Sequence, residues 1–166
     1  NDLTSAGGHN NYQAVTLSSG ATYTLGGYLK DSTRQYVSVS LNRAASASTY
    51  FAARFDLTNV TAPSTSVGST SGTISAYGIE DVGNGWRRAY ITGVVGAITD
   101  GLIVISSATD GTTWTADARG LQSYTGSNKV YYAWGVQCEA ASTRSSLIVT
   151  GSAAVSRAVD VIECSN

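Results

Sequence analysis

Alternation of apolar and polar residues is the dominant pattern along the chain, and it predicts strands. The segment YVSVSL (36–41) places Val37, Val39 and Leu41 on one face and Tyr and Ser side chains on the other. The segments ATYTLGGYLK (21–30) and YFAARFDL (50–57) alternate in a similar way. No window shows sustained helical periodicity. Further strands are predicted at 12–18, 73–80, 86–95, 101–107, 129–138 and 145–150.

Turn-forming stretches separate the predicted strands. SSG, KDSTR, DVGNG, ATDGTT and YTGSN are rich in the Gly, Asn, Asp and Ser residues that favour turns. The single proline, Pro63, falls in TAPSTSVGSTSG, which we expect to be a loop. Short strands at this spacing predict an all-β antiparallel β-sandwich, and we favour its jelly-roll version. No repeat or linker divides residues 1–166, so we expect a single domain.

The composition of the chain argues against nucleic acid and the membrane interior as partners. Charged residues make up 13% of the chain, about half the share of roughly 25% found in soluble domains. Ser and Thr number 23 and 20, so hydroxyl groups cover much of the surface, as suits an extracellular or virion-exposed protein. The net charge of −1 and the lack of a basic patch argue against nucleic acid. No window approaches the ~20 apolar residues that cross a bilayer, so we expect no membrane insertion.

The chain has two cysteines and one histidine. Cys138 lies within a predicted strand and Cys164 lies near the C-terminal end. We expect two unpaired thiols, with Cys138 acting as a small apolar residue, and a disulfide between them is the alternative. The cysteines do not make a zinc site by themselves, because His9 is far away in the sequence.

Three segments together carry a family resemblance. They contain Gly85-Trp86-Arg87-Arg88, then Tyr124-Thr125-Gly126 followed by the strand from Trp134 to Glu139, and finally the run from Thr150 to Asp160. In this order and spacing they resemble a family of jelly-roll modules common in bacteriophage tail and fibre proteins. Similar domains occur as carbohydrate-binding modules beside polysaccharide-degrading enzymes. The resemblance extends from about residue 11 onward.

The resemblance implies a sugar-binding or adhesion role, and it departs from the family in places. Cys138 stands where the family usually has an apolar residue, and Arg87 where an aromatic residue is common. No cofactor is implied. A structural calcium ion is compatible with a jelly roll, with Asp160 as the family-matched acid, but no Asp-rich loop of ligand spacing occurs.

The stretch YYAWGVQCEA (131–140) poses the question of scaffold or site. Simple alternation puts Tyr132, Trp134, Val136 and Cys138 on a core-facing side, and Tyr131, Gln137 and Glu139 on the other. Glu139 is then placed to pair with Arg157 or Arg144 and hold the last strand. We interpret the motif mainly as scaffold, and keep Tyr131 and Gln137 as candidate sugar contacts.

Other aromatic residues supply the remaining candidates. If Ala89 and Ile91 face inward, then Trp86, Arg88 and Tyr90 form an outward stripe suited to stacking on a sugar. Its alternative role is to cover the sheet edge, with Arg88 packed on Trp86. Trp114 lies in a loop-like segment, where it either anchors the loop or stacks on a ligand. The outward Tyr28 and Tyr36 extend the platform.

Four functional hypotheses follow. The leading one is a non-catalytic module that recognises a polysaccharide or cell-surface glycan by aromatic stacking and neutral hydrogen bonds, on a phage tail fibre or similar appendage. Such fibres are often homotrimers, so contact between subunits is an alternative role for the outward aromatic residues. The second is a carbohydrate-binding module from a polysaccharide-degrading enzyme, and the third is a virion domain with no ligand. Catalysis is the least supported, because the adjacent Glu80 and Asp81 point to opposite faces of a strand.

Overall fold

The computed structural model describes residues 3–45, 49–67, 72–97, 99–114 and 121–148. Its elements are all strands, and the described residues form no helix. The strands are β1 (Ala6–Gly8), β2 (Asn10–Thr16), β3 (Thr22–Asp31), β4 (Tyr36–Asn42), β5 (Thr49–Asp56), β6 (Thr61–Val67), β7 (Thr73–Gly83), β8 (Trp86–Val94), β9 (Asp100–Ala108), β10 (Ser123–Thr125) and β11 (Tyr131–Glu139).

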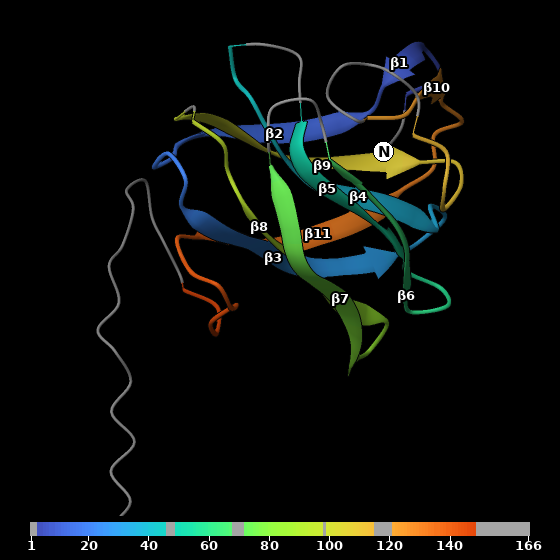
Figure 1. Ribbon diagram of the computed structural model, residues 1–166. Coiled ribbons are helices and arrows are strands. Elements are labelled where there is room, and N and C mark those ends of the chain that lie inside the picture. The colour runs from blue at the N-terminus through green and yellow to red at the C-terminus, as the bar shows by residue number, and fades with distance from the viewer. Residues whose placement is uncertain (1–2, 46–48, 68–71, 98, 115–120, 149–166) are drawn as a thin grey trace, which may run out of the picture.

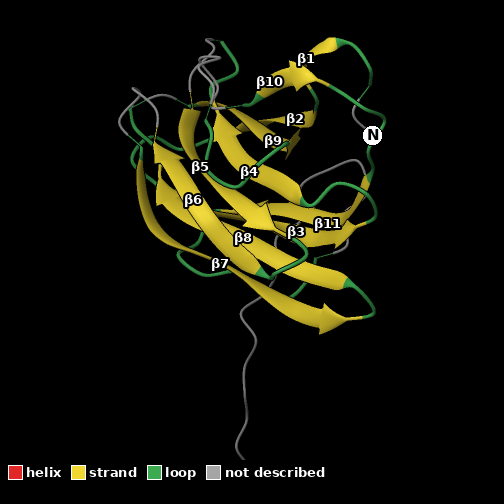
Figure 2. Ribbon diagram, turned by 90° about the vertical axis from the view of Figure 1, so that its right-hand side faces the viewer, coloured by secondary structure: helices red, strands yellow, loops and turns green. Residues whose placement is uncertain are grey.

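Two antiparallel sheets pack face to face as a β-sandwich (Figures 1 and 2). One sheet has the order β2-β9-β4-β5-β6 and the other β11-β3-β8-β7, while β1 and β10 pair separately. The chain crosses between the sheets after β2, β3, β6, β8 and β9, the last time by way of β10, so neighbouring strands come from distant parts of the sequence. Repeated crossing of this kind is a jelly-roll connection and confirms the predicted sandwich.

The core lies between the inward faces predicted by alternation. Leu25 and Leu29 of β3 and Ile91 of β8 are fully buried against Val37 and Phe55 of the five-stranded sheet. Burying side chains of this size contributes roughly 1.5–3 kcal/mol each. The core therefore fixes which side chains of the four-stranded sheet point outward.

One predicted loop and one predicted strand are wrong. The stretch around Pro63, predicted as a loop, forms β6, because an edge strand tolerates a proline that cannot donate to a ladder. Its Ser and Thr residues give no apolar alternation to detect. The strand predicted at 145–150 is absent over residues 145–148, which lie across the sheet as an irregular segment, and residues 149–150 are outside the described part.

Candidate functional site

The outer face of the four-stranded sheet carries most of the predicted sugar-contact residues. Because Ala89 and Ile91 are buried, the alternate residues of β8 point outward, as expected. Pairing with β3 and β11 aligns these residues in two rows across three strands. The first row is Trp86, Lys30 and Tyr132, and the second is Arg88, Tyr28 and Trp134.

An aromatic cleft opens at one end of this face. The rings of Tyr28 and Trp134 lie 5.3 Å apart at 49°, and Trp134 is 57% exposed. Trp86 faces them from β8, and the β7–β8 hairpin forms the remaining wall. The cleft thus joins three aromatic side chains from three strands. Its lining is Tyr28, Val82, Gly83, Asn84, Trp86 and Trp134.

The β7–β8 hairpin is fixed by its turn and by a lysine. Gly83 pairs with Trp86, so Asn84 and Gly85 form a two-residue loop, and both have positive φ. This is the Asn-Gly pattern of a type I′ turn. Lys30 donates from Nζ to the Asn84 carbonyl at 2.9 Å. The turn and this bond together hold Trp86 at the edge of the aromatic cleft.

A β-bulge in β11 explains why Trp134 is exposed. The register against β3 shifts between Trp134 and Gln137, and Gly135 within the bulge has φ 58°. The extra residue reverses the alternation. Cys138 therefore points inward as predicted, but the core-facing assignment of Tyr132 and Trp134 is wrong.

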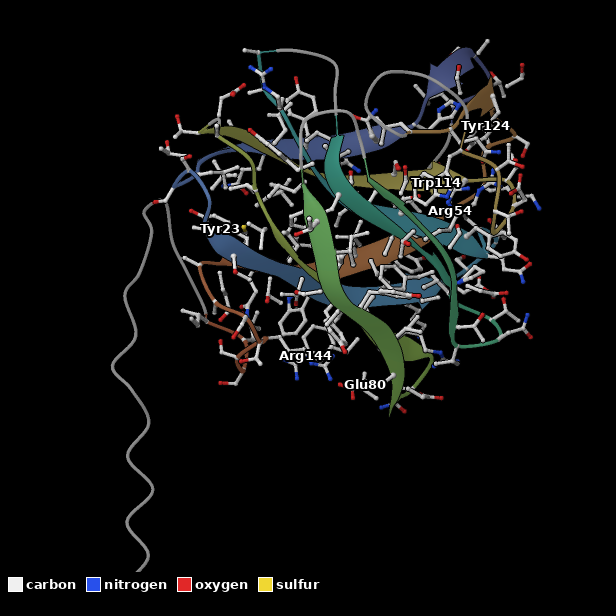
Figure 3. The ribbon with its side chains drawn as sticks, in the orientation of Figure 1. Tyr23, Arg54, Glu80, Trp114, Tyr124 and Arg144 are labelled. Carbon is white, nitrogen blue, oxygen red and sulfur yellow. The ribbon has the colours of Figure 1, made fainter. Side chains whose placement is uncertain are left out.

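Residues 140–148, here called the strap, cover the other half of the same face. Arg144 donates to Glu80 at 2.7 Å and its guanidinium lies 4.6 Å from the ring of Tyr90 (Figure 3 labels Arg144 and Glu80). Arg88 donates to the Ser145 carbonyl. The strap therefore covers Tyr90 and leaves the aromatic cleft open at the opposite end.

Gln137 and Glu139 hold the strap. Gln137 Nε2 donates to Glu139 Oε1 at 2.6 Å, while its Oε1 accepts from the Ile148 N–H at 3.0 Å. Glu139 also accepts from the Ser145 N–H at 3.2 Å. The ion pair expected between Glu139 and Arg144 is replaced by the Arg144–Glu80 pair, and the alternative partner, Arg157, lies outside the described residues. Gln137 and Glu139 thus make the contacts expected of a scaffold, since both bond to the strap.

Trp114 lies on the opposite sheet and has the contacts of a loop anchor. Its indole N–H donates to Ser64 Oγ at 3.0 Å, and its ring lies 4.3 Å from the Arg54 guanidinium (Figure 3). Arg54 is fully buried and also bonds to the carbonyls of Asp110 and Thr113 in the same loop. These contacts match the anchoring alternative for Trp114 and separate it from the aromatic cleft.

Two tyrosine candidates also lie apart from the cleft. The Tyr131 ring packs against the core and its hydroxyl donates to the Ile105 carbonyl at 3.5 Å. Burial raises the pKa of Tyr131 to about 12. The predicted outward position of Tyr131 is therefore wrong, because the bulge changes which residues of β11 face outward. Tyr36 is half-buried on the five-stranded sheet, next to Gly111 of the loop that carries Trp114.

The carboxylates whose pKa values are shifted accept hydrogen bonds from backbone N–H groups in turns. Burial opposes ionisation of Asp110, but hydrogen bonds from the Thr113 and Thr112 backbone and from Gln122 outweigh it and lower its pKa to about 2. Asp56 is similarly bonded to Thr58 and Asn59. Within the described part of the chain, no group of three or more His, Cys, Asp or Glu side chains is placed to bind a metal ion. Asp160, the weak calcium candidate, lies outside that part, as does Cys164.

Cys138 is expected to resist alkylation in the folded protein. It is a free thiol packed against the core, and burial, followed by the charge of Glu139, raises its pKa to about 12. Since the thiolate is the reactive form and little of it is present at neutral pH, alkylation should be slow in the folded protein. In a Cys164→Ser chain, mass spectrometry after iodoacetamide at pH 8 should show labelling at least roughly tenfold slower than in denaturant. Equal rates would contradict the burial.

The chain matches no protein-family model and no curated protein sequence. None of the described residues belongs to a helix long and apolar enough to cross a membrane.

Proposed function

We propose that this domain is a non-catalytic carbohydrate-binding module and that its ligand lies in the aromatic cleft. The observation that carries the proposal is the convergence of Tyr28, Trp86 and Trp134 on one open surface. Aromatic rings with polar edges suit the apolar face of a pyranose, and nearby amide and hydroxyl groups suit its hydroxyls. Asn84 and the Tyr28 hydroxyl supply such groups in the cleft.

The setting we propose is receptor recognition by a bacteriophage tail fibre or a similar appendage, on a virion surface or outside the cell. Its support is the ordered set of motifs around Trp86 and Trp134 and the hydroxyl-rich composition. A module of a polysaccharide-degrading enzyme shares the same ligand chemistry. The sequence that adjoins this domain in its parent protein distinguishes the two, as a fibre shaft or as a catalytic domain.

Replacing Trp134 or Trp86 by alanine is expected to weaken glycan binding by a factor of about 5 to 150. Stacking of a ligand ring on an aromatic side chain contributes roughly 1–3 kcal/mol per side chain, and 1.4 kcal/mol corresponds to a tenfold change in affinity. Trp134 is 57% exposed, so its truncation should leave the melting temperature nearly unchanged. The measurement is binding to an array of bacterial, plant and algal polysaccharides, with melting curves for each variant.

Tyr12→Ala is the matched control for this experiment. Tyr12 is 68% exposed and lies on β2 of the other sheet, so its loss should leave binding unchanged. Binding that survives in both tryptophan variants would move the ligand away from the aromatic cleft. A wild-type protein that binds no glycan would favour a purely structural virion domain. Mass in solution would then test whether Trp134 is covered by a neighbouring subunit.

A further inference from the structure

Two cations on the outer face of the four-stranded sheet have no carboxylate partner among the described residues. Three other arginines are paired with carboxylates: Arg43 lies 3.5 Å from Asp100, Arg87 lies 2.9 Å from Asp81, and Arg144 lies 2.7 Å from Glu80. By contrast, Lys30 donates to the Asn84 carbonyl and Arg88 to the Ser145 carbonyl. Lys30 and Arg88 therefore keep their full positive charge beside the cleft.

The sheet register places each of these cations next to the aromatic rings. Lys30 stands between Trp86 and Tyr132 in the first row, and its ammonium reaches the Asn84 carbonyl in the turn that forms one wall of the cleft. Arg88 is the neighbour of Tyr28 in the next row, and its guanidinium lies 5.8 Å from that ring. Each row thus holds one cation and two aromatic residues.

The carboxylates of this face are engaged elsewhere. Glu80 binds Arg144, and Asp81 binds Arg87 and caps the Gly83 N–H at 2.8 Å. Glu139 accepts from Gln137 and from the strap. None of the six residues that line the aromatic cleft is acidic. Lys30 and Arg88 therefore stand beside a cleft whose own lining carries no negative charge, although the whole chain has a net charge of −1.

We propose that the ligand is an acidic glycan, in which the carboxylate of a uronic acid or related sugar lies between Lys30 and Arg88 while its ring stacks in the aromatic cleft. This inference rests on the proposed function and names the sugar class for it. A guanidinium recognises a carboxylate by paired N–H donors, and an ammonium adds a point charge. This proposal differs from the expectation drawn from the low charge content of the sequence, which was recognition of the glycan by neutral hydrogen bonds.

The experiment compares each polymer with its own neutral form. Wild-type protein is titrated with polygalacturonate, alginate, hyaluronan and polysialic acid, and with the same polymers after reduction of their carboxyl groups to alcohols. A neutral-glycan array and a sulfated dextran are measured beside them. We expect at least one acidic polymer to bind roughly tenfold or more tightly than its reduced form. Its affinity should fall as sodium chloride is raised from 50 to 500 mM.

Charge variants test the two side chains directly. Lys30→Gln and Arg88→Gln should each weaken binding of the acidic polymer roughly tenfold more than binding of its reduced form, because both polymers need the cleft in place and only the acidic one needs the charge. Lys30→Arg retains the charge and should retain most of the affinity. Arg43→Gln, which removes a cation from the five-stranded sheet, is the matched control and should have no effect.

Each outcome decides between the proposals. Equal binding of acidic and reduced polymers, or binding of neutral glycans alone, would overturn the acidic ligand and leave the carbohydrate-binding function standing. Sulfated dextran binding as tightly as the best uronate would reduce the site to a general anion surface and overturn the carboxylate. Absence of binding to every polymer and every array glycan would overturn both proposals.

Discussion

Replacing Arg54 by alanine is expected to lower the free energy of unfolding by about 3–4 kcal/mol. The side chain is fully buried on β5 and serves three acceptors: Ser38 Oγ at 2.9 Å, and the carbonyls of Asp110 and Thr113 at 2.9 and 3.0 Å. Alanine would leave these acceptors unpaired and a cavity under Trp114. Burial lowers the pKa of Arg54 to about 10, so the charge is present throughout the neutral range.

Chemical denaturation of Arg54→Ala, Arg54→Lys and Trp114→Phe would check this prediction. Lysine keeps the charge but not the branched set of donors, so we expect a loss nearly as large. Phenylalanine keeps an aromatic ring beside Arg54 but loses the bond to Ser64 and part of the indole ring, which together should cost at least about 1 kcal/mol. A loss below about 1 kcal/mol in Arg54→Ala would mean that the loop does not depend on this residue. Glycan binding by Trp114→Phe should be unchanged.

Valine in place of Gly135 is expected to destabilise the protein by about 2–3 kcal/mol and to weaken glycan binding. The glycine has φ 58°, a conformation in which a β-branched residue is strained by about 1–3 kcal/mol. A Cβ atom there would also lie 2.9 Å from Leu147 Cδ1 of the strap. Relief of either conflict moves the bulge, and with it the neighbouring Trp134.

Gly20→Val separates the two causes of this effect. Gly20 has φ 70°, but nothing lies within 4 Å of a Cβ atom placed on it, so valine there reports backbone strain alone. Thermal melting of both variants, followed by binding of the best array glycan, makes the comparison. If Gly135→Val melts with the wild type and binds normally, the bulge does not position Trp134.

The sequence predicted the sandwich because most of its strands have one apolar face. It also predicted the outward side of β8, since Ala89 and Ile91 have no other role than core packing. The strand β6 was missed, because its alternating residues are small and polar and give no contrast between faces. Alternation thus finds strands that bury a face and misses edge strands that do not.

The candidate site was predicted only in part. Trp86, Arg88 and Tyr28 were found, because strict alternation holds through β3 and β8. Trp134 was assigned to the core because a single bulge at Gly135 reverses the phase of β11. A glycine inside a strand signals such a bulge but does not locate it. Lys30 belongs to none of the motifs. Its register position between Trp86 and Tyr132 depends on which strands pair, and the local sequence does not encode that pairing.

The strap also has a mechanical consequence. Its hydrogen bonds reach all four strands of the sheet: β7 through Glu80, β8 through Arg88, β11 through Gln137, and β3 through Thr24, whose hydroxyl donates to the Ala141 carbonyl at 2.9 Å. Tension applied to the chain beyond residue 148 is therefore shared by several strands and does not act on the edge strand β11 alone. Bonds loaded in parallel resist a pull better than bonds broken one after another. A pull of this kind would therefore have to break several of these bonds before it displaced β11 and the side of the cleft that β11 forms.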